Sequence, residues 1–158
     1  MKSCFIPLLF IAGSSFANEL TVEYHFLNTD LNGKSSSDVA GAVKVNYQTP
    51  VATNFNVVIS VQDSFSMSFF DESLDFKKAD IAGQYNLSIT EQFSLRPYIG
   101  VSHLLSNSKL LEDNKWGITY GFKGNYQINN WNVYLGLERF KVSDFDGDSF
   151  IVGIGYSF

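Results

Sequence analysis

The sequence predicts an all-β fold, an eight-stranded antiparallel up-and-down β-barrel. The composition is rich in residues that favour strands and turns, with 15 Phe, 8 Tyr, 2 Trp and 12 Gly. Large apolar residues alternate with small or polar residues along eight separate runs, which is typical of strands with two different faces. The number of runs is even, and long and short connections alternate between them, as expected for a meander of antiparallel strands.

The N-terminal segment, residues 1–17, predicts a secretory signal peptide. Lys2 supplies a positive start, residues 5–12 form a short apolar stretch, and residues 15–17 form a cleavage site with small residues at its first and last positions. A buried N-terminal helix or strand is the alternative. Cys4 precedes the apolar stretch, so a lipoprotein anchor is not indicated. The predicted barrel domain is residues 18–158.

Charge and metal-ligand content exclude several classes of protein. There are 16 acidic against 11 basic residues, a net charge of −5, so the chain lacks the electrostatic footprint of a nucleic-acid-binding protein. One Cys and 2 His are too few for a zinc cage. No apolar run reaches the roughly 20 residues of a transmembrane helix. We therefore expect no nucleic-acid partner, no metal and no cofactor.

The first four runs each set an apolar face against a small or polar face. Run 21–26 alternates Val, Tyr and Phe with Thr, Glu and His, and run 39–47 opposes Val and Tyr to Ala, Lys and Asn. Run 55–62 follows a short turn and sets Phe, Val and Ile against mostly polar residues. Run 79–87 follows a longer polar stretch and repeats the pattern.

The last four runs continue the alternation. Run 93–102 contains Pro97, which removes a hydrogen-bond donor from the ladder. Runs 116–126 and 131–138 are joined by an Asn-Asn pair, a tight hairpin signal because Asn tolerates positive φ. Run 150–158 ends the chain.

The apolar face is predicted to point outward, into lipid. An eight-stranded barrel has an interior only wide enough for side chains or one small ligand, and the apolar face carries aromatic rings on every run. The other face is dominated by Ala, Ser and Gly. A membrane barrel has this apolar exterior and polar interior, so a transmembrane barrel is favoured over a soluble periplasmic one, which is the alternative.

Aromatic residues gather at both ends of an aliphatic belt, as in the interfacial girdles of membrane barrels. Ile59, Leu135 and Ile154 lie in mid-strand. The rings near short turns are Tyr47, Phe55, Tyr85, Phe93, Tyr126, Trp131 and Phe158, and those near long loops are Phe26, Trp116 and Phe150.

Two segments resemble those of small eight-stranded bacterial outer-membrane barrels, such as the outer-membrane protein A transmembrane domain and the opacity-type barrels. The last strand resembles their C-terminal assembly signal, and residues 96–101 resemble their Pro-Tyr-apolar-Gly stretch. The resemblance implies an outer-membrane location in a Gram-negative cell and insertion by the barrel-assembly machinery. The residues of the implied assembly signal are Val152, Ile154, Tyr156 and Phe158.

Charged residues fall on the inward face in equal numbers of each sign. A charge removed from water must be paired or hydrated, so a balanced set predicts a salt-bridged plug, with a gated pore or proton relay as the alternative. His25 is predicted to form hydrogen bonds in the same interior. The predicted lumen network is Glu23, Lys44, Asp80, Arg96, Lys123 and Glu138.

One segment resembles a catalytic stretch. His103, Ser106 and Asn107 resemble the His-x-Ser-Asn segment of the outer-membrane lipid A deacylases, in which His acts as base to a Ser nucleophile. Residues three apart on a strand diverge, so we do not expect this pair to act together.

The long polar stretches predict acidic extracellular loops. Residues 144–148 hold three carboxylates around a Gly, but they lack the rest of the EF-hand pattern, so we interpret them as an acidic hairpin loop and leave surface binding of divalent cations open. Phe65, Met67, Phe69 and Phe70 predict either a protruding hairpin or an apolar contact surface. The lysines assigned to loops are Lys34, Lys77, Lys78, Lys109 and Lys141.

We therefore expect a monomeric outer-membrane barrel, both ends periplasmic, with a structural or surface-contact role of the adhesion type. The expected partners are outer-membrane lipid and lipopolysaccharide, the barrel-assembly machinery and a surface ligand of the loops. We expect no enzymatic activity; the alternatives are a lipid A-modifying enzyme and a small porin-like pore.

Overall fold

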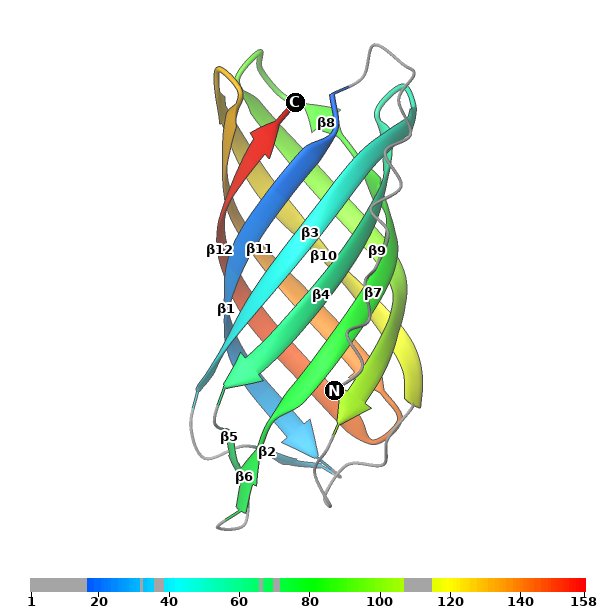
Figure 1. Ribbon diagram of the computed structural model, residues 1–158, viewed down its shortest axis with the longest axis vertical. Helices are drawn as coiled ribbons and strands as arrows, with labels where there is room; N and C mark the ends of the chain where they lie inside the picture. Colours follow the sequence, from blue (N-terminus) through cyan, green and yellow to red (C-terminus); the bar gives the residue numbers. More distant parts are fainter. Residues whose placement is uncertain (1–16, 32, 36–38, 66, 70–71, 107–114) are drawn as a thin grey trace, which may run out of the picture.

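The computed structural model is a closed antiparallel β-barrel (Figure 1). It describes residues 17–31, 33–35, 39–65, 67–69, 72–106 and 115–158. The long strands are β1 (Glu19–Leu31), β3 (Ala40–Ala52), β4 (Phe55–Phe65), β7 (Phe76–Tyr85), β9 (Phe93–Ser106), β10 (Lys115–Ile128), β11 (Trp131–Val142) and β12 (Phe145–Ser157).

The predicted signal peptide falls almost wholly on residues 1–16, which lie outside the described residues. In the part of the chain that the structure describes, no helix is long and apolar enough to cross a membrane.

Every long strand pairs with its neighbours in chain order, and the last strand pairs with the first. The β1–β12 ladder runs from Glu19 opposite Ser157 to Leu31 opposite Phe145. Asn18 and Phe158 complete the seam, because the backbone of each donates to the other at 3.0 and 2.9 Å. Closure satisfies backbone groups between strands, which a sheet with an open edge in hydrocarbon cannot do. The predicted eight-stranded up-and-down barrel is confirmed.

The strands are staggered. A circuit of directly paired residues that starts at Leu20 of β1 passes once around the barrel and returns to β1 at Asp30, further toward its other end. A barrel with such a stagger must tilt its strands, by roughly 35–45° in this class. The slanted strands are visible in Figure 1.

Four short strands extend the barrel wall or leave it. β2 (Lys34–Ser35) pairs with the end of β1, and β8 (Leu87–Ser88) pairs with the start of β9. β5 (Met67–Phe69) and β6 (Glu72–Leu74) form a separate two-stranded sheet between β4 and β7. This hairpin projects from the end of the barrel opposite the C-terminus (Figure 1).

Pro97 marks the place where one ladder is interrupted. The β7–β9 pairing stops at Gln84 opposite Tyr98, and it resumes in the same register at Leu87 opposite Leu95 as the β8–β9 pairing. Proline has no N–H to donate, so a break at this position is expected. On its other side β9 pairs with β10 without a break, with Pro97 opposite Phe122.

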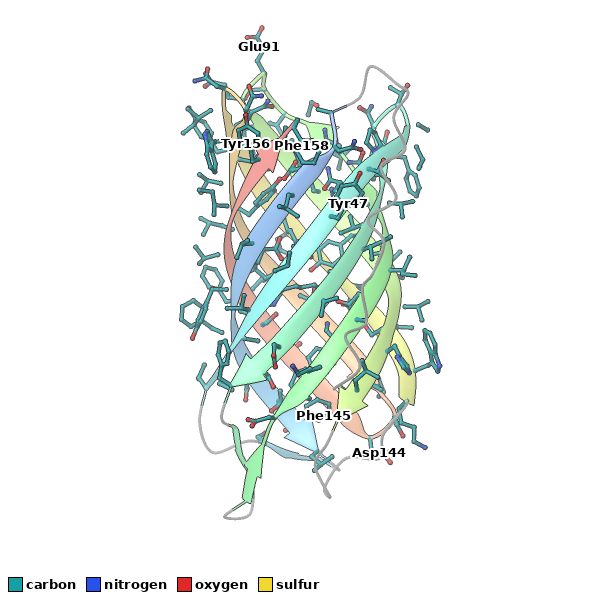
Figure 2. All side chains as sticks on the ribbon, viewed as in Figure 1. Tyr47, Glu91, Asp144, Phe145, Tyr156 and Phe158 are labelled. Atoms are coloured by element: carbon teal, nitrogen blue, oxygen red, sulfur yellow. The ribbon has the colours of Figure 1, made fainter. Side chains whose placement is uncertain are left out.

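Large apolar side chains cover the outside of the barrel (Figure 2). Ile59, Leu135 and Ile154 are 51%, 55% and 50% exposed, whereas the neighbouring Ser60 is 3% exposed and faces inward. The predicted assignment of faces is therefore confirmed on all eight long strands.

Glycines on the outer face lie beneath aromatic rings of the adjacent strand. A Cβ built on Gly83 would lie 2.9 Å from Cζ of Phe55, so the ring occupies the space that the missing side chain leaves. This pairing is the aromatic rescue of a strand glycine, and it explains why small residues interrupt a face of large ones. The outward pairs of ring and glycine are Tyr24 with Gly41, Phe55 with Gly83, and Phe93 with Gly124.

The connection between β11 and β12 differs from the predicted acidic loop. The turn is formed by Ser143, with φ of 55°, and Asp144, and β12 begins at Phe145. Phe145 and Ser149 face inward, while Asp148 stands on the outer face. The prediction of a long loop here was wrong because aspartates occupy the outward positions where apolar residues signal a strand elsewhere.

Candidate functional site

The barrel interior holds the polar cluster that the sequence predicts, and it is arranged in three successive layers. The positions on β1 mark the order: Glu19 lies nearest the short-turn end, Glu23 and His25 lie in the middle, and Leu27 lies toward the long-loop end. All four side chains are buried.

The layer at the short-turn end is centred on Arg96 of β9. Its Nη1 donates to Oε2 of Glu19 at 3.0 Å and to the Tyr134 hydroxyl at 2.7 Å, and that hydroxyl donates in turn to Glu19. Beside them, Gln84 donates from Nε2 to Oε1 of Gln48 at 2.8 Å. The apolar pattern does not identify Glu19, because this residue lies just before the first run, although it keeps the phase of the inward face.

The middle layer is a box of two lysines and two carboxylates. Lys44 Nζ lies 2.6 Å from a Glu138 carboxylate oxygen and 2.8 Å from an Asp80 oxygen. Lys78 Nζ lies 2.8 Å from the other Glu138 oxygen and 3.3 Å from Asp80. Each cation therefore contacts both anions. Tyr98 adds a hydroxyl that donates to Glu138 at 2.8 Å.

Lys78 is the clearest correction to the predicted network. The polar stretch before run 79–87 predicts a loop position for Lys78, but its side chain is 0% exposed inside the barrel. The reason is that β7 begins at Phe76, so Lys78 shares the inward face with Asp80. The same alternation, extended by one residue before the predicted run 79–87, would have found it.

Glu23 of β1 also lies in the middle layer, where it contacts Lys123 of β10 and His25. Lys123 Nζ lies 2.5 Å from its Oε1, and His25 Nε2 lies 3.3 Å from its Oε2. The other ring nitrogen of His25 lies 3.0 Å from the Ser149 hydroxyl. The predicted hydrogen bonding of His25 within the interior is therefore present.

The described interior is balanced in charge. Its buried carboxylates are those of Glu19, Glu23, Asp80 and Glu138, and its buried cations are Lys44, Lys78, Arg96 and Lys123. Glu19 and Lys78 are the two members that were not predicted, and because one is an anion and the other a cation, the charges remain balanced. Pairing of this kind offsets the desolvation of each charge, and removing one partner leaves the other uncompensated.

A small cavity lies among these groups. Its volume is about 10 Å³, close to the space that one water molecule needs. It is lined in part by Asn46 and Thr119, which are buried and whose side-chain polar atoms have no partner in the described protein. One water with several polar neighbours suits such a site.

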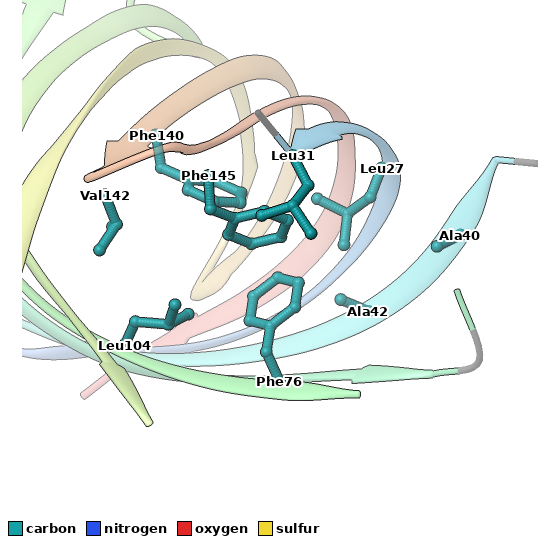
Figure 3. Packing of buried hydrophobic residues seen from close by; sticks show 9 residues of the cluster. All are labelled: Leu27, Leu31, Ala40, Ala42, Phe76, Leu104, Phe140, Val142 and Phe145. Atoms are coloured by element: carbon teal, nitrogen blue, oxygen red, sulfur yellow. The ribbon is translucent and has the colours of Figure 1, made fainter. Parts of the chain in front are cut away.

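An apolar cluster fills the layer at the long-loop end (Figure 3). The rings of Phe76, Phe140 and Phe145 lie 5.3 to 5.7 Å apart, and all three are at most 1% exposed. Lys78 Nζ lies 4.6 Å from the Phe140 ring centre, so this cluster rests on the charged box. The full cluster is Leu27, Leu31, Ala40, Ala42, Phe76, Leu104, Phe140, Val142 and Phe145.

This cluster corrects the expectation that the interior holds only small and ionic residues. Three phenylalanines fit because glycine lies opposite: Gly147 pairs with Phe140, and a Cβ on Gly147 would lie 2.3 Å from that ring. The aromatic rings of the described residues are thus divided between the lipid-facing surface and the interior, where Tyr98 and Tyr134 lie in the two polar layers and the phenylalanines lie at this end.

The deacylase-like segment is not assembled as a catalytic pair. His103 stands on the outer wall, where its ring stacks on Trp116 with 4.4 Å between ring centres. Ser106 is the last residue of β9, on the opposite phase of the strand, and Asn107 lies outside the described residues.

The aspartates of residues 144–148 meet basic side chains of β11. Arg139 Nε lies 3.6 Å from an Asp148 oxygen, and Lys141 Nζ lies 3.7 Å from an Asp146 oxygen. Among the described residues there is no group of three or more His, Cys, Asp or Glu side chains placed to hold a metal ion.

The residues of the implied assembly signal form one outward row on β12. Val152, Ile154, Tyr156 and Phe158 are 39%, 50%, 41% and 50% exposed. Tyr156 also packs against Trp131, with 5.0 Å between ring centres.

Comparison with known proteins supports the class of fold. No known family and no curated protein matches the sequence. Among solved structures, the chain is similar to Ail, the attachment invasion locus protein of Yersinia pestis, with 18% identity and a TM-score of 0.66 over 92% of this chain and 100% of that one. It is also similar to Neisserial surface protein A, with 8% identity and a TM-score of 0.70 over 89% and 97% of the two chains.

A third similar structure is the N-terminal β-barrel domain of Pseudomonas aeruginosa OprF, with 11% identity and a TM-score of 0.60 over 87% of this chain and 97% of that one. The fold is that of the small eight-stranded outer-membrane β-barrels. Together with an exterior of apolar side chains, it assigns the chain to the bacterial outer membrane, as predicted.

Proposed function

We propose that this barrel acts as a surface-contact protein whose loops, and not its interior, meet the partner. The observation that carries the proposal is the filled interior: a charged box covered by three packed phenylalanines leaves little for a solute to pass through. The function then belongs to what the barrel displays outside the membrane. One similar structure is that of Ail, which is named as an attachment invasion locus protein, and this name supports the same role.

The β5–β6 hairpin is the best candidate contact element. It extends beyond the barrel, and β5 pairs only with β6 among the described residues. The outer edges of such a hairpin can accept a further strand from a partner. The protein would be anchored as a monomer by its lipid-facing belt after the barrel-assembly machinery reads the outward row of β12.

Catalysis is not part of the proposed function. The segment that resembles the lipid A deacylases places His103 against Trp116 on the outer wall, on the opposite phase from Ser106. A lipid A-modifying activity would need these side chains on one face.

Replacing residues 67–74 by Asn-Gly is expected to abolish attachment of expressing cells to an epithelial monolayer. The shortened connection removes the hairpin and leaves the barrel strands intact. Replacing Thr53 and Asn54 by Asn-Gly, at a turn on the opposite end, is the control and should leave attachment unchanged. Heat-dependent gel mobility checks that both variants are folded.

Full attachment by the hairpin variant would contradict the proposal. The same strains also test the absence of catalysis: the mass profile of their lipid A should match that of cells without the protein, and a new lipid A species would overturn this part.

A further inference from the structure

The outer wall carries a groove on the side formed by β10, β11, β12 and β1. Its volume is about 470 Å³, within the roughly 300–1,000 Å³ typical of small-molecule sites. Residues from all four strands line it, together with Val39.

Two parallel rows of directly paired residues build this groove. The apolar row crosses the four strands as Phe122, Leu137, Phe150 and Phe26. The polar row, one step closer to the long loops, crosses them as Tyr120, Arg139, Asp148 and Asn28.

The polar row marks the loop-side boundary of the apolar belt. On β11 every outward residue from Trp131 to Leu137 is apolar, and Arg139 is the first charged one. On β12 the outward residues from Phe158 back to Phe150 are apolar, and Asp148 follows. Long loops are extracellular in bacterial outer-membrane barrels, so this boundary lies in the outer leaflet.

Arg139 is placed to bind an anion at this boundary. It is half exposed, and its contact with Asp148 is long, at 3.6 Å, so the pair contributes little stability of its own. The contact involves Nε, which leaves the two terminal amino groups able to form a bidentate interaction with a phosphate. Lys141 stands one step further out on the same face of β11.

The apolar row is shaped to hold a hydrocarbon chain below that anion. Phe26 and Phe150 pack side by side with 6.2 Å between ring centres, and Leu137 and Phe122 continue the surface. The side chains are about half exposed, so they present apolar area to the membrane.

We infer that this groove is a binding site for lipid A, the phosphorylated and acylated sugar lipid of the outer leaflet, with a phosphate at Arg139 and an acyl chain along the apolar row. The phosphate of lipid A would lie at the guanidinium of Arg139, at the boundary of the apolar belt, and its acyl chain would lie against the apolar row within the outer leaflet. The inference rests on the outer-membrane location and is independent of the proposed surface-contact role.

Native mass spectrometry of the protein extracted in mild detergent and incubated with lipid A tests this site. The wild type should retain one lipid A tightly, and Arg139→Gln should weaken retention by roughly tenfold or more, the loss expected for a charge-assisted interaction. Leu137→Trp should also weaken retention, because it fills the groove without changing the charge.

Lys77→Gln is the matched control. Lys77 is also an outward basic residue near the loops, paired with Asp63 at 2.9 Å, but it lies away from the groove, so this variant should bind lipid A as the wild type does. Retention by Arg139→Gln equal to the wild type would overturn the inference. Equal retention of phosphatidylglycerol by the wild type would overturn the choice of lipid A. Arg139 is half exposed, so its variant decides the matter if Leu137→Trp does not fold.

Discussion

Glu138→Gln is expected to lower the free energy of unfolding by about 3–5 kcal/mol, the cost of leaving a buried ion pair without one partner. The Glu138 carboxylate contacts Lys44 and Lys78 and accepts the Tyr98 hydrogen bond. Glutamine keeps the volume but removes the charge, so two buried lysines then share Asp80 alone. Urea unfolding of the barrel in phospholipid vesicles measures the loss.

A double variant and a control variant test whether the loss comes from the buried ion pair. Adding Lys78→Met to Glu138→Gln restores the balance of interior charges and should recover much of the lost stability. Asp63→Asn breaks a pair that is more than half exposed and should change stability by no more than about 1 kcal/mol. Unchanged stability of Glu138→Gln together with a new ion conductance in planar bilayers would show that the network is a gate and not a structural plug.

Ile59→Arg is expected to reduce the yield of folded barrel and to destabilise it by about 2–4 kcal/mol, the cost of Arg at the bilayer midplane. Ile59 is 51% exposed and lies in mid-strand on β4, so the new charge would face hydrocarbon. Folding yield in vesicles, read from heat-dependent gel mobility, is the measurement.

Val51→Arg is the control for position. Val51 is 57% exposed but lies beside the short turn at the end of β3, where a charge reaches the interface at a cost of roughly 0–1 kcal/mol. If both variants fold with equal yield, the region around Ile59 faces water and the membrane assignment fails.

The sequence was sufficient to predict the wall of the barrel. Alternate residues of a strand face opposite sides of the wall, so only two assignments of inside and outside are possible. The face that carries aromatic rings on every run is too bulky for the narrow interior of an eight-stranded barrel, so it must point outward. Ile59, Ser60 and Leu135 therefore take the sides that the pattern predicts.

The contents of the interior were predicted less completely. Lys78 and Glu19 lie just outside the runs that apolar residues define, so the pattern gave no reason to extend the strands to them. The cluster around Phe140 was missed for a different reason: inward bulky rings require opposing glycines such as Gly147, and that match depends on the register between strands, which a single sequence does not specify.

The groove on the outer wall depends on register in the same way. Arg139 and Phe150 are separated along the chain by a turn and two strand segments, and only the β11–β12 ladder places them in adjacent rows. The polar connections, by contrast, lack periodicity, so their sequence predicts acidic loops and a surface ligand but does not identify that ligand.

The central claim is that bulky apolar side chains face lipid while their chain neighbours face a filled interior. A lipid-soluble diazirine, photolysed in vesicles that contain the folded barrel and read out residue by residue by mass spectrometry, tests it directly at the adjacent positions Ile59 and Ser60. We expect labelling of Ile59 and none of Ser60 in the folded barrel, and labelling of both when the chain is unfolded. Labelling of Ser60 with protection of Ile59 would contradict the claim.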